Sequence, residues 1–325
     1  MSAPQVFTIQ DAMSSTGAID WTIEGVLPTG SIALMYGAPG SKKTYAALDL
    51  ALCSALGKQW LGFDVAQGNV LIVDEESGKK RLFRRLQEVV RGHLAENDNP
   101  PIFATSLHGF NFWAPSSGTA ASDLQAVIAS HGIKLVIIDA LADVMLGGDE
   151  NTVRDTQKVF AALRRIAEAT GATIVVIHHS LKNGNGYRGS SAIAGALDLA
   201  LEVESKPKES LVQFRVTKAR DSEPTDFTGE CHWEPGQFWM TEATGPTQAA
   251  RRIYTKGERA ILECIITNGN AATMQTLLQA TALNEGTIRN RLTEFMRTGL
   301  VRNTATSGQA AVYETNPLVL AENPL

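Results

Sequence analysis

The chain has 325 residues, of which 44% are hydrophobic and 19% charged, with a formal net charge of −5. This length predicts two domains or one large domain with an appendage, and the apolar fraction excludes a disordered chain. No uncharged apolar run approaches the roughly 18 residues that span a bilayer, and the N-terminal residues lack the pattern of a secretory signal. The three cysteines, Cys53, Cys231 and Cys264, stand far apart, which argues against a zinc site and a disulfide framework. We therefore expect a cytoplasmic protein and exclude secreted, membrane and metal-scaffold classes.

The first 240 residues alternate short apolar runs with longer amphipathic stretches. Near-continuous apolar runs, typical of strands covered on both faces, lie at 31–36, 69–73, 133–138 and 172–177. Stretches with helical spacing lie at 44–56, 79–94, 121–131 and 152–170. We expect segments 197–203, 211–217 and 231–240 to be additional, antiparallel strands. This order predicts an α/β fold with a mostly parallel sheet flanked by helices.

A phosphate-binding loop is indicated where the first buried strand runs into a helix. The stretch comprises Gly37, Ala38, Pro39, Gly40, Ser41, Lys42, Lys43, Thr44 and Tyr45. In such a loop, backbone N–H groups and the helix N-terminus surround phosphates, a lysine reaches the β- and γ-oxygens, and a hydroxyl binds Mg²⁺. Lys42 stands where the pattern GxxxxGK[ST] has its second glycine, so Lys43 is the expected phosphate lysine and Lys42 is expected to point to solvent. The alternative interpretation is a glycine-rich turn beside surface lysines.

Polar side chains also follow three other strands of the predicted sheet. Asp139 ends one strand, where a Walker B carboxylate would hold Mg²⁺ together with Thr44, although an aspartate there is also a common helix cap. A second strand runs into Asp74-Glu75-Glu76-Ser77 and a third into His178-His179-Ser180. Hydrolysis needs a carboxylate that orients water and a polar group that senses the γ-phosphate. The four strand ends together therefore predict a nucleotide site.

With these residues in place, the chain resembles the RecA-like ATPases, and within them the branch of RepA-like hexameric helicases of plasmids and phages. The resemblance covers roughly residues 18–240. It is carried by the lead-in at 21–30, VDEES at 73–77, LVIIDAL at 135–141 and IVVIHHSLKNGNGYRGSSAIAGALDLAL at 174–201. It implies ATP and Mg²⁺ as cofactors, with Lys43 and Thr44 on phosphate and metal and Asp139 as the Walker B acid. It also implies Glu76 as catalytic glutamate and His179 as γ-phosphate sensor, with Glu75 and His178 as the alternatives.

The same resemblance implies an assembly of several copies. Lys218 and Arg220 are similar to a Lys-x-Arg pair that ring-forming relatives insert into the neighbouring subunit's ATP site. This implies a homo-oligomer, either a ring, in this branch a hexameric one, or a filament; the alternative is a solvated charged turn. The loop 180–191, with Lys182 and Arg188, would line a central channel and contact single-stranded DNA, unless it is only a surface turn. The loop after Leu141 is acidic and a poor candidate for DNA binding.

The last 75 residues form a different kind of segment. Residues 1–250 carry 21 Lys and Arg against 28 Asp and Glu, whereas residues 251–325 carry 8 against 6. We predict domains at 1–243 and 257–325 joined by a linker at 244–256. Helices are expected at 258–267, 273–280 and 284–297, the last with an apolar stripe of Ile288, Leu292, Phe295 and Met296, followed by a hairpin at 299–301 and 311–314 around Ser307-Gly308. This pattern resembles a winged helix–turn–helix domain that contacts duplex DNA through Arg289, Asn290, Arg291 and Arg302, although such domains also bind proteins.

These features lead to one principal hypothesis and two alternatives. The principal hypothesis is an ATP-driven motor on single-stranded DNA, a replicative-type helicase of a plasmid, phage or other mobile element. The second is a recombinase-like or KaiC-like regulatory ATPase that the winged helix recruits to duplex DNA. The third is a DNA-binding regulator without catalysis, for which Lys42 is the only support.

Overall fold

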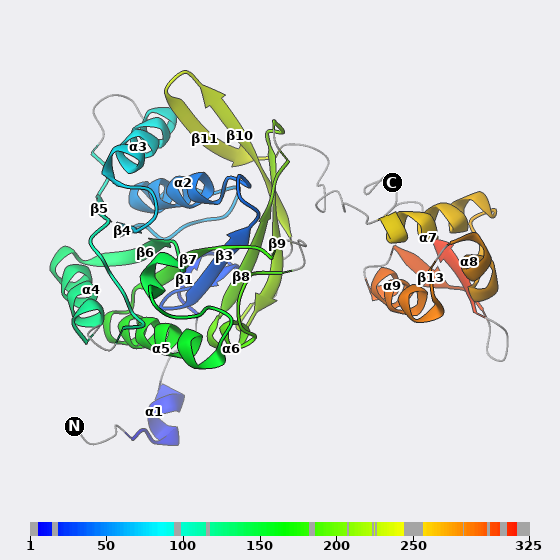
Figure 1. Ribbon diagram of the computed structural model, residues 1–325, viewed down its shortest axis with the longest axis horizontal. Helices are drawn as coiled ribbons and strands as arrows, with labels where there is room; N and C mark the ends of the chain where they lie inside the picture. The colour runs from blue at the N-terminus through cyan, green and yellow to red at the C-terminus, as the bar shows by residue number, and fades with distance from the viewer. Residues whose placement is uncertain are drawn as a thin grey trace. The chain divides into compact units, whose positions relative to one another are not determined.

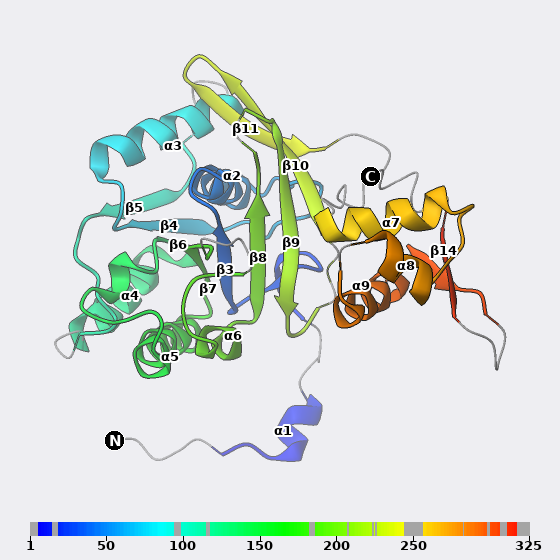
Figure 2. The same cartoon turned by 45° about the vertical axis from the view of Figure 1, so that its right-hand side comes forward.

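The structure, a computed structural model, describes residues 6–14, 19–93, 99–114, 118–181, 186–206, 208–222, 224, 226–243, 256–281, 283–297, 300–305 and 311–316. The chain divides into two compact units, Met1–Ala243 and Thr244–Leu325, each of which is described by itself (Figures 1 and 2). Among the helices formed by the described residues, none combines the length and the apolar character needed to cross a membrane.

One nine-stranded sheet, in the order β11-β10-β9-β8-β3-β7-β6-β4-β5, organises the first unit. Its strands are β3 (Ile32–Gly37), β4 (Asn69–Asp74), β5 (Ile102–Ser106), β6 (Ile133–Asp139), β7 (Thr173–His179), β8 (Leu199–Glu204), β9 (Leu211–Ala219), β10 (Phe227–Glu234) and β11 (Gln237–Glu242). Strands β3 to β8 pair in parallel, and the last three add antiparallel to them. The predicted mostly parallel sheet is confirmed.

Three details of the sheet differ from the sequence prediction. Strand β8, expected to be antiparallel, lies parallel to β3, because the chain crosses back through α6 (Ala192–Ala196) before it enters the strand. The segment 231–240, expected to be one strand, is a hairpin in which Glu234 pairs with Gln237 and Gly236 has a φ of 75°. Strand β5 was not predicted, since its side chains are only half-buried or exposed and give no continuous apolar run.

Helices cover both faces of the sheet (Figure 1). The covering helices are α2 (Lys43–Leu56) and α3 (Lys79–His93) on one face, and α4 (Gly118–His131), α5 (Val153–Thr170) and α6 on the other. Successive residues of a strand point to opposite faces, so Met35 belongs to the core under α2 and its neighbour Leu34 to the core under α5. Because both faces of the central strands are buried, nearly every residue in them is apolar, and the sequence shows continuous apolar runs.

Smaller elements complete the first unit. They are α1 (Ile9–Ser14), the hairpin of β1 (Trp21–Ile23) and β2 (Leu27–Pro28), and the 3₁₀ turn η2 (Asp143–Met145). The hydroxyls of Thr22 and Thr173 lie 2.6 Å apart, which attaches the lead-in hairpin to the start of β7. Helix α1 buries none of its residues.

The described residues of the second unit form three helices and a three-stranded antiparallel sheet. Its elements are α7 (Lys256–Thr267), β12 (Ala272–Thr273), α8 (Met274–Ala280), α9 (Glu285–Arg297), β13 (Val301–Asn303) and β14 (Val312–Thr315). The side chains of Ile288, Leu292 and Phe295 are buried in its core, but Met296, expected in the same stripe, is 39% exposed. Its place on the helix turns it out of the core. The expected turn at Ser307-Gly308 and most of the expected linker lie outside the described residues.

Candidate nucleotide site

The polar strand ends of the first unit meet at one edge of the sheet. In the parallel register, Gly37 of β3 lies opposite His179 of β7, and Asp74 of β4 lies opposite Asp139 of β6. Parallel strands place their carboxyl ends at the same edge, where ligands bind in open α/β sheets. The four strand ends that the sequence singled out are thus side by side.

The loop from Gly37 to Tyr45 leaves this edge and begins α2. Ala38, Pro39 and Gly40 are exposed, whereas Ser41 is buried, and the Ser41 N–H donates to the carbonyl of Ala38 at 3.1 Å. A Cβ at Gly37 would lie 2.3 Å from the carbonyl oxygen of Val203, so this position requires glycine. The close approach holds the start of the loop against β8.

Lys42 occupies the position at which the motif has its second glycine, and its backbone conformation explains why the motif has glycine there. It has φ 68° and ψ 16°, a left-handed conformation immediately before α2, which glycine adopts without steric cost. Its ammonium does not point to solvent, as the sequence analysis expected: it donates to the hydroxyl of Ser205 and, at 2.7 Å, to the carbonyl of Glu209. The expectation was wrong because the turn after β8 brings acceptors to the lysine.

Lys43 is buried at the base of the loop. Its ammonium donates to the carbonyls of Gly37 and Ala38, each at 2.9 Å. Burial lowers the pKa of Lys43, and the nearby carboxylates of Asp139 and Glu76 oppose that shift. A buried cation at the start of a helix, next to exposed loop N–H groups, is suited to phosphate.

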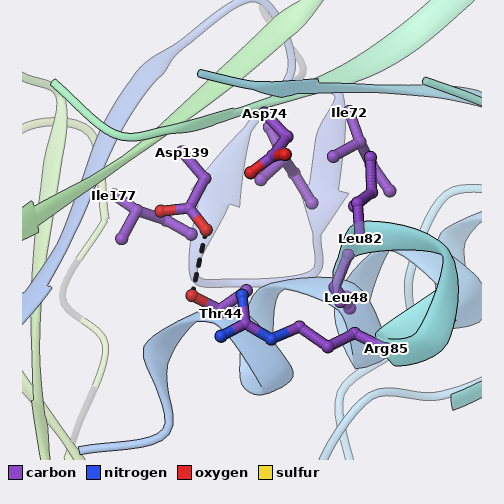
Figure 3. Close-up of a pocket in the computed structure, with 9 residues that line it drawn as sticks. Thr44, Leu48, Ile72, Asp74, Leu82, Arg85, Asp139 and Ile177 are labelled. Atoms are coloured by element: carbon purple, nitrogen blue, oxygen red, sulfur yellow. Dashed lines mark hydrogen bonds between the residues drawn. The ribbon is translucent and has the colours of Figure 1, made fainter. Parts of the chain in front are cut away.

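Thr44 and Asp139 form the central contact of the site. The Thr44 hydroxyl donates to Asp139 Oδ2 at 2.9 Å (Figure 3), and Oδ1 of the same carboxylate is buried without a hydrogen-bond partner among the described residues. Burial raises the pKa of Asp139 to about 6, the Thr44 hydroxyl opposes this shift, and Glu76 and Asp74 add to it. A hydroxyl and a carboxylate with an unused oxygen are ligands that Mg²⁺ accepts, so these residues fit the metal.

The two glutamates after β4 have different surroundings. Glu75 accepts hydrogen bonds from the backbone N–H groups of Gly109 at 3.0 Å and Phe110 at 3.3 Å, so it fixes a neighbouring loop. Glu76 is exposed, and its charge raises the pKa of Asp139 and, after the larger effect of burial, that of Asp143. Of the two carboxylates, only Glu76 is both accessible and electrostatically coupled to the Thr44–Asp139 contact.

The two histidines that end β7 also differ. His178 is fully buried, and its Nε2 donates to the carbonyl of Arg188 at 2.7 Å. Burial lowers its pKa to about 4. His179 lies at the strand end beside Gly37, and its buried Nδ1 has no partner among the described residues. Nδ1 of His178 is likewise buried without such a partner, so the two differ in that Nε2 of His178 has a structural contact, whereas His179 lies at the end of the strand.

Arg85 is a residue at the site that the sequence analysis missed. It lines a small cavity whose walls are Thr44, Leu48, Ile72, Asp74, Leu82, Arg85, Ile137, Asp139 and Ile177. Figure 3 shows its guanidinium pointing from α3 toward Thr44, and it donates to the Ser77 hydroxyl at 2.9 Å. The cluster of cations that follows Glu76 in the sequence was the available signal.

Lys218 and Arg220 lie away from the phosphate loop of their own chain. Lys218 donates to the carbonyl of Leu197 at 2.6 Å, and Arg220 pairs with Asp198 at 3.0 Å. Asp198 in turn accepts from the N–H of Ile32, the first residue of β3, whereas the phosphate loop follows its last residue. The pair is thus held near the opposite edge of the sheet.

Glu150 joins the loop predicted to line a channel to the acidic loop after Leu141. Arg188 pairs with the Glu150 carboxylate at 2.6 Å, and the Ser190 N–H donates to the Glu150 carbonyl at 2.8 Å. Lys182, the other predicted DNA contact in this loop, lies outside the described residues. The loop's one described candidate cation is therefore paired with a carboxylate.

The predicted DNA contacts of the second unit show the same pattern. Arg289 pairs with Glu285 at 2.5 Å, Arg291 with Glu258 at 3.4 Å, and Arg302 with Glu314 at 3.1 Å. Asn290 is exposed on the same helix. The three arginines are accessible, but each has an acidic neighbour.

One group of potential metal ligands lies away from this edge. The ligand atoms of Asp49, Cys53 and His93 lie within 4.8 Å of one another, which the cysteine spacing had not indicated. Asp49 is buried and contacts His93 at 2.6 Å, and it accepts from the N–H of Met240 at 3.0 Å. These contacts connect α2, α3 and β11. We therefore interpret the group as a buried set of hydrogen bonds that holds these three elements together.

Comparisons with known proteins bear on the fold and on the family. A search of curated proteins gives no match. Among solved structures, a DnaB-like replicative helicase, described with its interactions with primase, matches with a TM-score of 0.50 and 16% identity over 71% of this chain and 66% of that chain. A RadB recombinase matches with a TM-score of 0.48 and 16% identity over 66% of this chain and 91% of that chain. The helicase match confirms the RecA-like fold.

The family model for the AAA domain matches residues 2–185, more than half of the sequence, and the chain therefore belongs to the AAA-domain family.

Proposed function

We propose that this protein hydrolyses ATP and uses the energy to move along single-stranded DNA as a replicative-type helicase. The observation that carries the proposal is the 2.9 Å hydrogen bond between Thr44 and Asp139, which lies beside the buried Lys43 and the exposed Glu76. The fold shared with a DnaB-like helicase supports it. The sequence resemblance favours a helicase of a plasmid, phage or other mobile element.

The geometry supports a specific division of roles in hydrolysis. Lys43 would bind the β- and γ-phosphate oxygens, and the loop N–H groups would surround the phosphates. Thr44 and Asp139 would hold Mg²⁺, which neutralises charge on the phosphate oxygens. Glu76 would orient the attacking water and accept its proton as the bond from the γ-phosphorus to the ADP oxygen breaks, and His179 would sense the γ-phosphate.

The same proposal requires several copies of the chain. Because Lys218 and Arg220 are held near the edge opposite their own phosphate loop, they would act on the nucleotide of a neighbouring copy, which favours a homo-oligomeric ring, in this proposal a hexamer. Residues 1–243 would form the ATPase domain and 244–256 a linker. Residues 257–325 would form a winged-helix domain that contacts duplex DNA; three helices followed by the β13–β14 hairpin support it.

Steady-state ATP hydrolysis with and without single-stranded DNA tests the proposal. We expect DNA to stimulate hydrolysis several-fold and Lys43→Ala to abolish it. If hydrolysis does not respond to DNA, the protein is not a motor on single-stranded DNA. If the wild type does not hydrolyse ATP, the proposal that it is an ATPase is wrong.

A recombinase-like or KaiC-like regulatory ATPase is the second candidate. The ion pair of Arg188 with Glu150 favours it, because a motor needs loop cations that are free to follow phosphates. Strand displacement on a forked duplex would identify the helicase, whereas ATP-dependent filaments and strand pairing would identify the recombinase.

A further inference from the structure

Helix α3 presents a strongly basic surface that has no role in the hydrolysis scheme. Six of its fifteen residues are Lys or Arg and only Glu88 is acidic. Lys79, Lys80, Arg81 and Arg84 are exposed and line a surface hollow together with Ser77 and Gly78. We call these four cations the basic α3 face.

Most of the positive charge on this face is free. Within the part of the chain that the structure describes, Lys79, Lys80 and Arg81 form no ion pair, and Arg84 contacts Glu88 at 3.7 Å. Glu88 also accepts from the Tyr45 hydroxyl at 2.6 Å, so it is shared. Arg188 and the arginines of the second unit, by contrast, each have a carboxylate partner. Unpaired cations concentrated on one face of a chain with net charge −5 indicate a local site for a polyanion.

An exposed aromatic ring distinguishes between kinds of polyanion. Phe83, one turn after Lys79, is 46% exposed, and the Lys79 ammonium lies 5.2 Å from the centre of its ring. Single-stranded nucleic acid is bound by cations on the phosphates together with aromatic rings on which bases stack. An acidic protein segment would use the cations but has no comparable use for the ring.

The location of the basic α3 face is also suitable for binding a single strand. Helix α3 follows β4 after the short segment that contains Glu76, so its first turn lies at the same edge of the sheet as the candidate nucleotide site. Ser180 and Leu181, which follow β7, leave the same edge. A strand bound at this edge could contact both elements.

We propose that the basic α3 face, with Phe83, is a second binding surface for single-stranded nucleic acid. Lys80 and Arg81 contact phosphates, and Phe83 stacks on a base. This inference deepens the proposed function and rests on it, because it assumes that the protein acts on a single strand.

Fluorescence anisotropy of labelled oligo(dT) with the full-length protein tests this surface. Lys80→Ala/Arg81→Ala should weaken binding, and the slope of log affinity against log salt should become shallower by about 1.4, since each lost contact to a single strand contributes about 0.7. Phe83→Ala should weaken binding about fivefold or more, the minimum expected for one stacked base, without changing the salt slope. Hydrolysis of ATP without DNA should be unchanged in all of them.

A control variant removes the same charge elsewhere. Lys134 and Arg165 are exposed cations on β6 and α5, and Lys134→Ala/Arg165→Ala should leave oligo(dT) binding and its salt slope as in the wild type. Equal effects of the two double variants would overturn the inference.

Two other outcomes separate this inference from the proposed function. If the wild type does not bind oligo(dT), the proposed function fails and this inference fails with it. If the wild type binds and the α3 variants bind equally well, only this inference is overturned. A normal affinity combined with a smaller assembly mass for Lys80→Ala/Arg81→Ala would instead identify the face as a contact between copies of the chain.

Discussion

The phosphate edge of the first unit and the predicted DNA contacts of the second unit hold their polar groups in opposite ways. At the phosphate edge, Oδ1 of Asp139 and Nδ1 of His179 are buried without a partner among the described residues. In the second unit, Arg289 and Arg302 are exposed and paired with carboxylates. A buried unsatisfied polar atom costs about 1–3 kcal/mol, whereas an exposed ion pair contributes about 0–1 kcal/mol. The first arrangement therefore leaves polar atoms available to a ligand, whereas the arginines of the second would have to leave their carboxylate partners before they could bind one.

The largest expected effect is on the rate of ATP hydrolysis, and it tests which of the two glutamates after β4 acts at the nucleotide site. Glu76→Gln should lower the rate of ATP hydrolysis by about 10²–10⁴-fold, the usual contribution of a general base. Glu75→Gln should leave the rate close to the wild type, because Glu75 is occupied by the N–H groups of Gly109 and Phe110. Steady-state hydrolysis at saturating ATP measures both. The opposite ranking would show that the loop contact of Glu75 is broken in the active enzyme.

The second prediction concerns the pH dependence of stability and the buried His178. Burial lowers the pKa of His178 to about 4 from an ordinary value of 6.5, so between these values the unfolded chain binds more protons than the folded one. The stability contributed by neutral His178 is complete above pH 6.5 and is lost as the pH falls toward 4, by about 3 kcal/mol in total. Denaturant unfolding of the wild type and His178→Asn across this range should show a flatter pH profile for the variant.

The exposed His131 provides the matched control for this measurement. His131→Asn should keep the wild-type profile. A His178→Asn profile as steep as that of the wild type would mean that other groups cause the acid sensitivity.

The parts of this site that the sequence predicted are those determined by local pattern. The strand ends, the loop and Thr44 follow from apolar runs and from a motif whose residues are consecutive. The choice between Glu75 and Glu76 could not be made locally, because it depends on N–H groups about 34 residues away in the chain. The sequence resemblance nevertheless named Glu76, and the surroundings of the two glutamates favour the same residue.

The wrong expectations depend on contacts between distant segments. Lys42 contacts Glu209, 167 residues further along the chain, which no pattern around the loop reveals. The direction of β8 depends on how the chain crosses back through α6, and hydrophobic periodicity carries no direction. The ion pair of Arg188 with Glu150 joins two loops that the sequence analysis treated separately, one as a DNA contact and the other as too acidic for it.

A third, smaller effect concerns Lys42, the one residue of the phosphate loop that departs from the motif. A non-glycine residue in the left-handed conformation costs about 1–2 kcal/mol, and Lys42→Gly removes this cost along with the contacts to Ser205 and Glu209. We expect hydrolysis to be unchanged and the free energy of unfolding to change by no more than about 1 kcal/mol. Lys42→Ala, which loses the contacts but keeps the strained backbone, should be less stable than Lys42→Gly. A strong loss of hydrolysis in both variants would instead show that the ammonium of Lys42 leaves its partners to bind phosphate.

The smallest expected effect decides whether the paired arginines of the second unit are available to DNA. Glu285→Gln removes the partner of Arg289 on α9, and an i,i+4 pair of this kind is worth about 0.3–0.5 kcal/mol. If Arg289 contacts duplex DNA, releasing it should raise the affinity about twofold, as measured by anisotropy of a labelled duplex at constant salt. Arg289→Ala should remove this gain when it is combined with Glu285→Gln. An affinity that does not respond to either change would favour a protein-binding role for this module, because its cations would then serve only to hold α9 in place. The phosphate edge would in that case be the only one of the two regions whose polar groups are arranged for a ligand.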